Sequence, residues 1–414
     1  MRIELLMVGD ELLGGAIVDT NSAWLMGRLY DLGVETNRKT VVGDDVETIA
    51  SAIEEAACRK TELLVICGGL GPTEDDLTGD AVALAAGAPR DIDPEAKRLV
   101  ESRLLKIGME ATKRQLRQAR LPSGSKALEN AFGTAPGFFL ALSSGCAIFC
   151  LPGPPREFRP MAEDHVLPFL DARLGGRRHA ALTLRTFGKG ESFVASLIEE
   201  SAGRFPHVRI GFQLVFPEIH LRLRAKGRDE TEAGARCEEA ALALEKDLGD
   251  ILFGREKETL PSVVSGMLDR RNESLSLAES CTGGLLGSLV TETPGASRYL
   301  LASMVTYSNE MKVRLLGVPE ETLAEHGAVS EQCARAMAEG VLERTGAAHA
   351  LSITGVAGPG GGTDEKPVGT VWLALASQRL RTLATRRRLA GDREMIRRAS
   401  AFHALDLLRR RLMD

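Results

Sequence analysis

The chain has 414 residues, of which 44% are hydrophobic and 26% are charged, and its 52 basic side chains nearly balance 57 acidic ones. This length predicts about two or three domains, and the composition excludes a collagen-like, low-complexity or mainly disordered protein. No run of 18 uninterrupted apolar residues occurs and the start turns acidic too early for a signal peptide, so we expect a cytoplasmic protein without a membrane span. Seven scattered cysteines argue against a disulfide framework and fit a reducing compartment.

The N-terminal region, residues 1–170, alternates strand-like apolar runs with helical periods. Strands are predicted at 3–8, 36–42 and 63–67, and amphipathic helices at 20–32 and 45–59. This alternation of strands and helices predicts an α/β domain with a doubly wound parallel sheet and helices on both faces.

The third predicted strand leads into a glycine-rich loop, which precedes a helix predicted near 78–86. Backbone amides in such a loop can approach a phosphate closely, and the helix start adds a partial positive charge. Asp76 in this loop and Asp44 after the neighbouring strand are the kind of ligand that Mg²⁺ takes together with waters and phosphate oxygens. The alternative is that Asp44 or Asp45 only caps the next helix and that Asp80 has no role, and we favour this alternative for Asp45 and Asp80 but not for Asp76.

Residues 171–253 form a second region, in which Ile219, Leu221 and Leu223 alternate with polar residues. This two-residue period is typical of an antiparallel strand with one solvated face. With a helical pattern on either side, the region is predicted to be a small α+β domain. The charged stretch at 254–258 is predicted to be a linker.

The last region, residues 255–414, is predicted to be a further α/β module. Its strands are expected near 274–278, 299–307, 350–354 and 370–376. The chain from Arg379 onward holds 11 arginines and 4 acidic residues, and it is predicted to be a terminal helix with a basic face. Aromatic residues make up only 4% of the chain and offer few stacking platforms for bases, so we do not expect nucleic acid as a partner.

Ser280 lies where the first strand of this last module ends and a helix is predicted to begin. Amides at a helix start can form an oxyanion hole, and Gly283 and Gly284 allow a substrate to approach the backbone. The alternative is a structural role in which Ser280 or Thr282 only caps the helix.

A tyrosine and a lysine, Tyr307 and Lys312, follow the second strand of the module. A buried Lys312 would have a lowered pKa and could act as a neutral base toward a serine, with Tyr307 relaying or orienting the proton. From the spacing alone, a solvated surface lysine is the better interpretation. A further glycine-rich loop offers Thr354 and backbone amides to a phosphate, and the Arg393 guanidinium suits bidentate phosphate recognition.

The N-terminal region resembles the CinA family in motifs that occur in the family's order, at 9–13, 19–21, 68–78, 133–137 and 151–155. The resemblance implies a domain related to molybdopterin-binding proteins of the MoaB/Mog type, with ADP-ribose pyrophosphatase activity that depends on Mg²⁺, Mn²⁺ or Co²⁺. It implies Asp44 and Asp76 as metal ligands, and molybdopterin is the alternative ligand of the same pocket. The substrate-binding residues that it implies are Gly68, Gly69, Gly71, Thr73 and Gly153.

The last region resembles the C-terminal CinA domain, which is similar to nicotinamide mononucleotide (NMN) deamidase of the PncC type. The matching runs are 278–284, 305–312, 326–330, 355–362 and 366–371. The resemblance implies hydrolysis of the NMN carboxamide to nicotinate mononucleotide and ammonia without metal or cofactor, with Ser280 as nucleophile and Tyr307 and Lys312 as its activating partners. The substrate contacts that it implies are Thr282, Gly283, Gly284, Thr354, Gly355, Gly358 and Arg393.

The middle region resembles the KH-like segment of the family at 187–192. It lacks the Gly-x-x-Gly clamp with which a KH module holds nucleic acid, so we expect it to position the other domains or to support a homodimer.

Together, the resemblances of the first and last regions imply a two-activity enzyme of pyridine-nucleotide recycling that acts on NMN and ADP-ribose. An adaptor protein in competence or DNA damage is the alternative.

Overall fold

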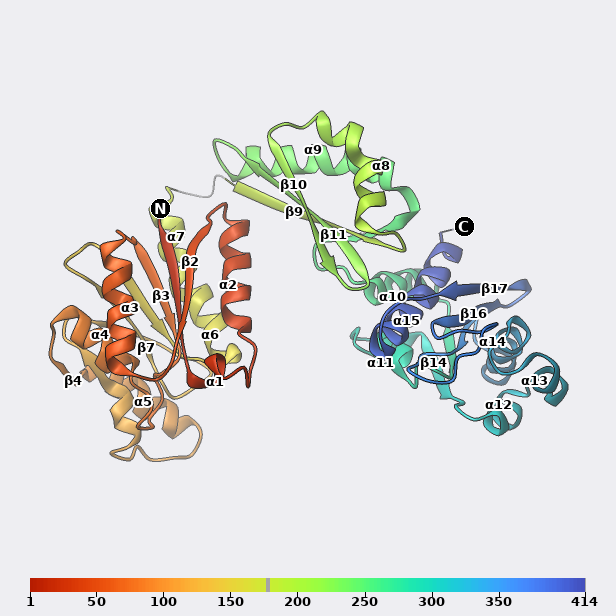
Figure 1. Cartoon of the computed structure of the whole chain (residues 1–414), viewed down its shortest axis with the longest axis horizontal. Coiled ribbons are helices and arrows are strands. Elements are labelled where there is room, and N and C mark those ends of the chain that lie inside the picture. The colour runs from red at the N-terminus through yellow and green to blue at the C-terminus, as the bar shows by residue number, and fades with distance from the viewer. Residues whose placement is uncertain (176–178, 414) are drawn as a thin grey trace. The chain divides into compact units, whose positions relative to one another are not determined.

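The computed structural model of the protein describes residues 1–175 and 179–413, which divide into two compact units (Figure 1). One unit comprises Met1–Ala181, apart from 176–178, together with Arg224–Arg236, and the other comprises Leu182–Leu223 and the described residues from Cys237 onward. Each unit has hydrophobic clusters of its own. Among the described residues, no helix combines the length and the apolar character needed to cross a bilayer.

The sheet of the N-terminal unit has six strands in the order β2-β1-β3-β8-β7-β6. They are β1 (Ile3–Val8), β2 (Thr36–Val42), β3 (Leu63–Cys67), β6 (Lys126–Leu128), β7 (Gly137–Ala141) and β8 (Ala147–Leu151). β1 runs parallel to β2 and β3, and β3 to β8, which confirms the doubly wound core. The prediction of a wholly parallel sheet is wrong at one edge, where β7 pairs antiparallel with β6 and β8. β7 and β8 are joined by a short turn, and parallel neighbours would need a long crossover.

Helices cover both faces of this sheet, as the continuous burial of β1 requires, because successive side chains of a strand point to opposite faces. Leu6 and Val8 share one cluster with residues of α3, α4 and α5, whereas Leu5 and Met7 share another with residues of α2, α6 and α7. Figure 1 shows α3 and α2 on opposite sides of the strands. The helices are α1 (Asp10–Leu13), α2 (Thr20–Asp31), α3 (Val46–Cys58), α4 (Thr78–Ala86), α5 (Pro94–Lys106), α6 (Pro155–Met161) and α7 (Leu167–Arg173), and a small antiparallel pair is formed by β4 (Arg90–Ile92) and β5 (Arg120–Pro122).

The middle region folds as a four-stranded sheet with two helices, and the order of its strands is β10-β11-β9-β12. Its elements are β9 (His179–Phe187), α8 (Glu191–Gly203), β10 (Val208–Val215), β11 (Glu218–Lys226), α9 (Glu230–Leu248) and β12 (Leu252–Arg255). The predicted alternation along β11 is confirmed, with Ile219, Leu221 and Leu223 buried. The predicted linker at 254–258 is wrong in its first part, because Gly254 and Arg255 pair with β9 as the end of β12.

The last region is a five-stranded sheet with the strand order β14-β13-β15-β16-β17. Its strands are β13 (Leu275–Glu279), β14 (Leu300–Val305), β15 (His349–Gly355), β16 (Thr370–Ser377) and β17 (Leu380–Arg388). Its helices are α10 (Leu260–Arg271), α11 (Leu285–Thr291), α12 (Asn309–Leu316), α13 (Glu320–His326), α14 (Glu331–Thr345) and α15 (Arg393–Arg411). The predicted terminal helix from Arg379 is wrong over its first part, which is the antiparallel edge strand β17. Exposed basic side chains suit such an edge because they discourage pairing with another chain.

The parallel core of this second sheet determines where a site can form. β13 runs parallel to both β14 and β15, so the carboxyl ends of all three strands lie at one edge. Leu275 and Leu277 of β13 pack with residues of α10, α11 and α15, and Ala278 packs with residues of α14. Loops that leave a buried, parallel strand at its carboxyl end are where α/β proteins bind their ligands.

Candidate functional site

Ser280 and Lys312 are brought together at the carboxyl end of β13. Ser280 follows this strand directly, and its backbone N–H donates to the Ile353 carbonyl at 3.0 Å, which fixes the serine beside β15. Lys312 on α12 is only 1% exposed, and its Nζ lies 3.0 Å from Ser280 Oγ. The solvated surface lysine that the spacing alone favoured is therefore excluded.

The surroundings of Lys312 favour its uncharged form. Burial lowers the pKa of the Lys312 ammonium from its ordinary value. Its Nζ also lies 2.8 Å from the Thr306 carbonyl oxygen and 3.2 Å from that of Tyr307. A neutral amine has two N–H groups and one lone pair, so donation to the two carbonyls leaves the lone pair for the hydroxyl proton of Ser280. This arrangement is that of a general base next to a nucleophile.

Glu279 occupies the start of α11. Its side chain is fully buried, and its carboxylate accepts hydrogen bonds from the backbone N–H groups of Gly284 and Leu286, both at 3.0 Å, and of Gly287 at 2.8 Å. The alternative that Ser280 or Thr282 caps this helix is therefore wrong. We also expected amides at the helix start to hold an oxyanion. For the N–H groups of Gly284, Leu286 and Gly287 this expectation is wrong, because they already bind the Glu279 carboxylate.

The loop between Ser280 and α11 is held by an arginine that the sequence analysis missed. Arg397 donates to the Thr282 carbonyl from Nε at 3.1 Å and from Nη2 at 2.6 Å. Gly283 and Gly284 have φ values of +60° and +92°, which other residues rarely adopt, so the tight turn here requires glycine. Arg397 lies four residues after Arg393 on α15, and this spacing on one helix face was the signal that could have identified it.

The other residues that the resemblance implies for this module lie around the glycine-rich loop at 355–362. Arg393 donates to the Gly358 carbonyl at 2.6 Å and to the Tyr307 hydroxyl at 3.1 Å. Tyr307 is 61% exposed. It contacts Lys312 through its backbone carbonyl and not through its hydroxyl. The buried Thr354 hydroxyl donates to the Ala328 carbonyl at 2.7 Å. Contacts of Thr354, Gly355, Gly358 and Arg393 with a substrate stay predictions.

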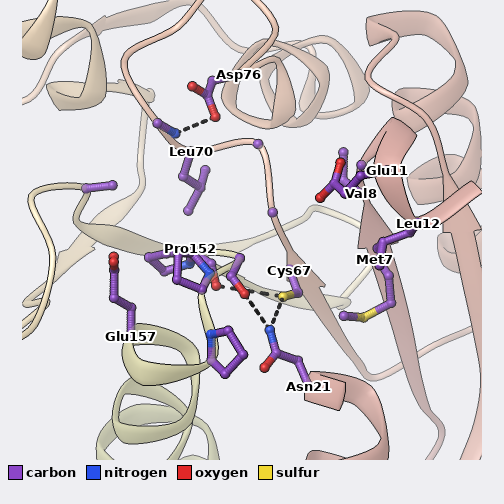
Figure 2. Close-up of a pocket in the computed structure, with 18 of the residues that line it drawn as sticks. Met7, Val8, Glu11, Leu12, Asn21, Cys67, Leu70, Asp76, Pro152 and Glu157 are labelled. Atoms are coloured by element: carbon purple, nitrogen blue, oxygen red, sulfur yellow. Dashed lines mark hydrogen bonds between the residues drawn. The ribbon is translucent and has the colours of Figure 1, made fainter. Parts of the chain in front are cut away.

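The N-terminal unit holds a cavity of about 560 Å³ at the carboxyl ends of β1, β3 and β8. Its lining includes the acidic residues Glu11, Asp19, Asp44, Asp75, Asp76 and Glu157, of which Asp19 forms an ion pair with Lys39 at 2.7 Å. Figure 2 shows Glu11, Asp76 and Glu157 around it. Among the described residues, no lysine or arginine lines this cavity.

The glycine-rich loops contribute to this cavity as predicted, but Thr73 does not. Its lining includes Gly68, Gly69, Gly71 and Gly153. Asp76 fastens the first loop, because its carboxylate accepts from Gly71 N at 2.6 Å, from Thr73 N at 2.8 Å and from Thr73 Oγ1 at 2.6 Å. Figure 2 shows one hydrogen bond from the loop backbone to Asp76. Both carboxylate oxygens of Asp76 thus already have donors.

Asp44 is the better-placed acid for a cation. Its carboxylate accepts from Asp10 N at 2.9 Å. Burial raises its pKa, and the negative charges of Asp10, Glu11 and Asp75 raise it further. A cation beside Asp44 would relieve this repulsion. Within the described ranges, however, no group of three or more His, Cys, Asp or Glu side chains is arranged to hold a metal, so waters or ligand oxygens would have to complete the coordination of Mg²⁺.

Asp45 has the capping role that was favoured for it, and Asp80, for which no role was expected, forms an ion pair. Asp45 is the N-cap of α3 and accepts from Thr48 N at 2.9 Å. Asp80 on α4 forms an ion pair with Arg90. Both contacts are structural, so we do not assign Asp45 or Asp80 to the cavity.

Three family models match successive parts of the chain. They are described as "Probable molybdopterin binding domain" at residues 4–172, "Damage-inducible protein CinA KH domain" at 182–254 and "CinA C-terminal domain" at 257–412. This order confirms the predicted fold class of two α/β domains with a small KH-like α+β domain between them.

Relatives of this chain match it over its full length. A CinA-like protein of Anaeromyxobacter sp. (strain Fw109-5) is 45% identical over 99% of this chain and 98% of its own, and one of Geobacter metallireducens is 41% identical over 100% of both. The crystal structure of competence/damage inducible protein CihA from Agrobacterium tumefaciens is 41% identical and covers 37% of this chain and 94% of its own, with a TM-score of 0.37. On the full-length identity, the chain belongs to the CinA family.

Proposed function

We propose that the last domain hydrolyses the carboxamide of NMN to nicotinate mononucleotide and ammonia. The observation that carries the proposal is the 3.0 Å contact between Ser280 Oγ and the buried Nζ of Lys312. The substrate is inferred from the resemblance of this domain to NMN deamidases. The type of reaction is inferred from the arrangement of the two side chains. An adaptor protein has no need of a buried amine next to a serine hydroxyl.

The reaction proceeds through an acyl-enzyme. Lys312 takes the hydroxyl proton as Ser280 Oγ bonds to the carboxamide carbon, and it then gives this proton to the leaving nitrogen. The C–N bond breaks, ammonia departs, and the nicotinate nucleotide remains esterified to Ser280. A water molecule, deprotonated by Lys312, attacks the ester and restores the serine hydroxyl.

Ammonia release from NMN tests this proposal in the full-length protein. Ser280→Ala removes the nucleophile, and we expect it to reduce ammonia release to background. The matched control is Ser297→Ala, which changes an exposed serine of the same domain and leaves the rate unchanged. Ammonia release by Ser280→Ala at the rate of the unaltered protein would refute the mechanism.

The N-terminal domain supports a second proposal, the metal-dependent hydrolysis of ADP-ribose to AMP and ribose 5-phosphate. The observation that favours it is the acidic lining of the cavity. A diphosphate and these carboxylates repel each other, so a diphosphate can enter only with a cation that neutralises the charges of both. Asp44 would hold the metal, and a divalent metal supplies an activated water and neutralises phosphate oxygens when bound. In the Gly68–Gly71 loop, the backbone N–H groups of Gly68 and Gly71 already donate to the Leu151 carbonyl and to Asp76, so phosphate oxygens would have to bind the amides of Gly69 and Leu70.

AMP release from ADP-ribose with Mg²⁺, Mn²⁺ or Co²⁺ tests this second proposal. We expect Asp44→Asn to abolish it and Asp76→Ala to abolish it through the loop that Asp76 fastens. Asp45→Asn, which changes only the exposed cap of α3, serves as the control and keeps the activity. If none of the three metals supports AMP release, the pyrophosphatase proposal is wrong and molybdopterin becomes the ligand to test.

A further inference from the structure

A second pocket of the N-terminal unit lies beside the acidic cavity and has the opposite charge. Its volume is about 220 Å³, and it is lined by residues of α5 and of the loop 129–136 between β6 and β7. Thr134 lines both the pocket and the cavity, so the two spaces are neighbours. We call this space the basic pocket, because its charged lining residues are Arg98, Arg103, Lys106 and Glu129.

The loop wall of the basic pocket is fixed by Asn130. Its side-chain oxygen accepts from Phe132 N at 3.0 Å and from Gly133 N at 2.9 Å. Its amide nitrogen donates to the Ala135 carbonyl and to Glu157 Oε2, both at 2.9 Å. A Cβ atom at position 133 would overlap with Glu157 Oε2, so this close packing requires glycine. The motif that begins at Gly133 therefore forms one side of a pocket whose shape is set before any ligand binds.

The positive charge of the basic pocket comes from two side chains that lack a counter-charge. Arg98 is balanced, because Glu95 accepts from its Nε at 2.8 Å and Glu129 adds a second negative charge nearby. Arg103, which is half-buried, and Lys106 form no ion pair or hydrogen bond with any residue that the structure describes. The pocket therefore presents two unpaired positive charges.

We propose that the basic pocket binds the phosphate group of a phosphate monoester. Such a group carries nearly two negative charges at neutral pH, which matches Arg103 and Lys106, and a guanidinium can bind two of its oxygens at once. The alternative is that these two cations only complement the carbonyls in the last turn of α5. That alternative explains the residue types, but it does not explain the fixed loop wall that faces them.

The position of the basic pocket indicates which monoesters it takes. AMP and ribose 5-phosphate, the products of the ADP-ribose hydrolysis proposed above, are both phosphate monoesters. The carboxylates of the acidic cavity repel these dianions, whereas the basic pocket on the other side of Thr134 attracts them. We therefore expect the products to occupy the basic pocket. This link to the products rests on the proposed pyrophosphatase function, but the binding of a phosphate group to the pocket does not.

Calorimetric titration of the full-length protein with inorganic phosphate, without metal or ADP-ribose, tests the basic pocket directly. We expect Arg103→Gln and Lys106→Gln each to raise the Kd for phosphate about tenfold, the factor associated with one lost charge-assisted contact. Arg28→Gln, which changes an exposed arginine in the last turn of α2, is the matched control and keeps the affinity. AMP should displace phosphate, and adenosine, which lacks the phosphate group, should not.

Asp44→Asn separates the basic pocket from the acidic cavity. Phosphate held in the cavity by a residual metal ion would bind more weakly to this variant, whereas phosphate in the basic pocket would not. Three results would each overturn the inference: no phosphate binding by the unaltered protein, weaker binding by Asp44→Asn, or equal binding by Arg103→Gln and Arg28→Gln. If Arg103→Gln lowers the unfolding midpoint without phosphate, Lys106→Gln at its exposed position decides. A protein that binds phosphate but leaves ADP-ribose intact would refute only the pyrophosphatase proposal.

Discussion

At the scale of single residues, the chemistry of the last domain depends on the burial of Lys312. An ammonium group loses its hydration when it is buried, and Lys312 has carbonyl and hydroxyl oxygens as neighbours in place of water. Among the described residues, no carboxylate forms an ion pair with it. Burial therefore shifts the ionisation of Lys312 toward the neutral amine, which is the form that can accept the proton of Ser280.

The protonation of Lys312 predicts how the proposed deamidase activity depends on pH. In this mechanism only the neutral amine is active, so kcat/KM should rise with pH as the Lys312 ammonium loses its proton. Because burial lowers the pKa of this ammonium, the midpoint of the rise should lie below the ordinary lysine value of 10.5. Nicotinamide riboside, which lacks the phosphate, should give the same midpoint and thereby exclude ionisation of the substrate. A rate that does not change with pH, or a midpoint at 10.5, would contradict this assignment.

Arg397 is predicted to be a positioning residue for the nucleophile. Arg397→Lys keeps the charge but not the paired hydrogen bonds to the Thr282 carbonyl, so Ser280 should lose its alignment with the substrate. We expect kcat for NMN to fall about 10- to 100-fold while KM changes little. Arg381→Lys, at an exposed position on β17, is the control. Equal kinetics for the two variants would show that the bonds of Arg397 do not serve catalysis.

At the scale of elements, the start of α11 shows how one side chain can organise a turn. This helix has only seven residues and no side-chain cap from Gly284, so its first N–H groups depend on Glu279 at the end of β13. The same contacts connect the strand to the helix and enclose the loop that carries Ser280. A helix this short is not stable by itself, which makes the contacts of its first turn important.

Glu279→Gln is predicted to destabilise the last domain. The substitution replaces one acceptor oxygen by an NH₂ group that faces backbone N–H donors, and it leaves buried amides without a partner. We expect a loss of about 1–3 kcal/mol in the free energy of unfolding, measured by denaturant titration. Glu310→Gln, an exposed residue in the first turn of α12, should change stability by much less. If both variants are as stable as the unaltered protein, Glu279 does not hold the helix.

The same elements show what the sequence could and could not predict. Apolar runs identified β1, β3 and β13 because a buried strand needs little more than such a run. β17 was missed because its arginines suggested a helix, and only its pairing with β16 makes it a strand. The roles of Ser280 and Lys312 came from the resemblance to the C-terminal CinA domain, because the spacing alone favoured a surface lysine and left a capping role open for Ser280. The roles of Glu279 and Arg397 could not be predicted, because each depends on which backbone groups the fold places beside it.

At the scale of the whole molecule, the two candidate sites lie in different compact units. The N-terminal cavity is built from β1, β3, β8 and their loops, whereas Ser280 and Lys312 belong to the last domain. No residue is shared between the two sets. Each candidate site is therefore built from side chains of its own unit.

This separation predicts that the two activities can be removed one at a time in the full-length protein. Ser280→Ala should abolish ammonia release from NMN and leave AMP release from ADP-ribose unchanged, and Asp44→Asn should do the reverse. Both activities are measured on the same preparations, and the unfolding midpoint of each variant shows whether the altered domain is folded. Loss of both activities in a variant that unfolds at the normal temperature would mean that the sites depend on each other.

The central claim, that the uncharged amine of Lys312 activates Ser280, is tested most directly by ammonia release from NMN in Lys312→Met. This variant keeps a long apolar side chain in the buried position and removes only the amine, and Lys257→Met changes an exposed lysine of the same domain as a control. The account predicts a fall in kcat of about 100-fold or more for Lys312→Met and none for the control. A Lys312→Met protein that releases ammonia as fast as the control would contradict it.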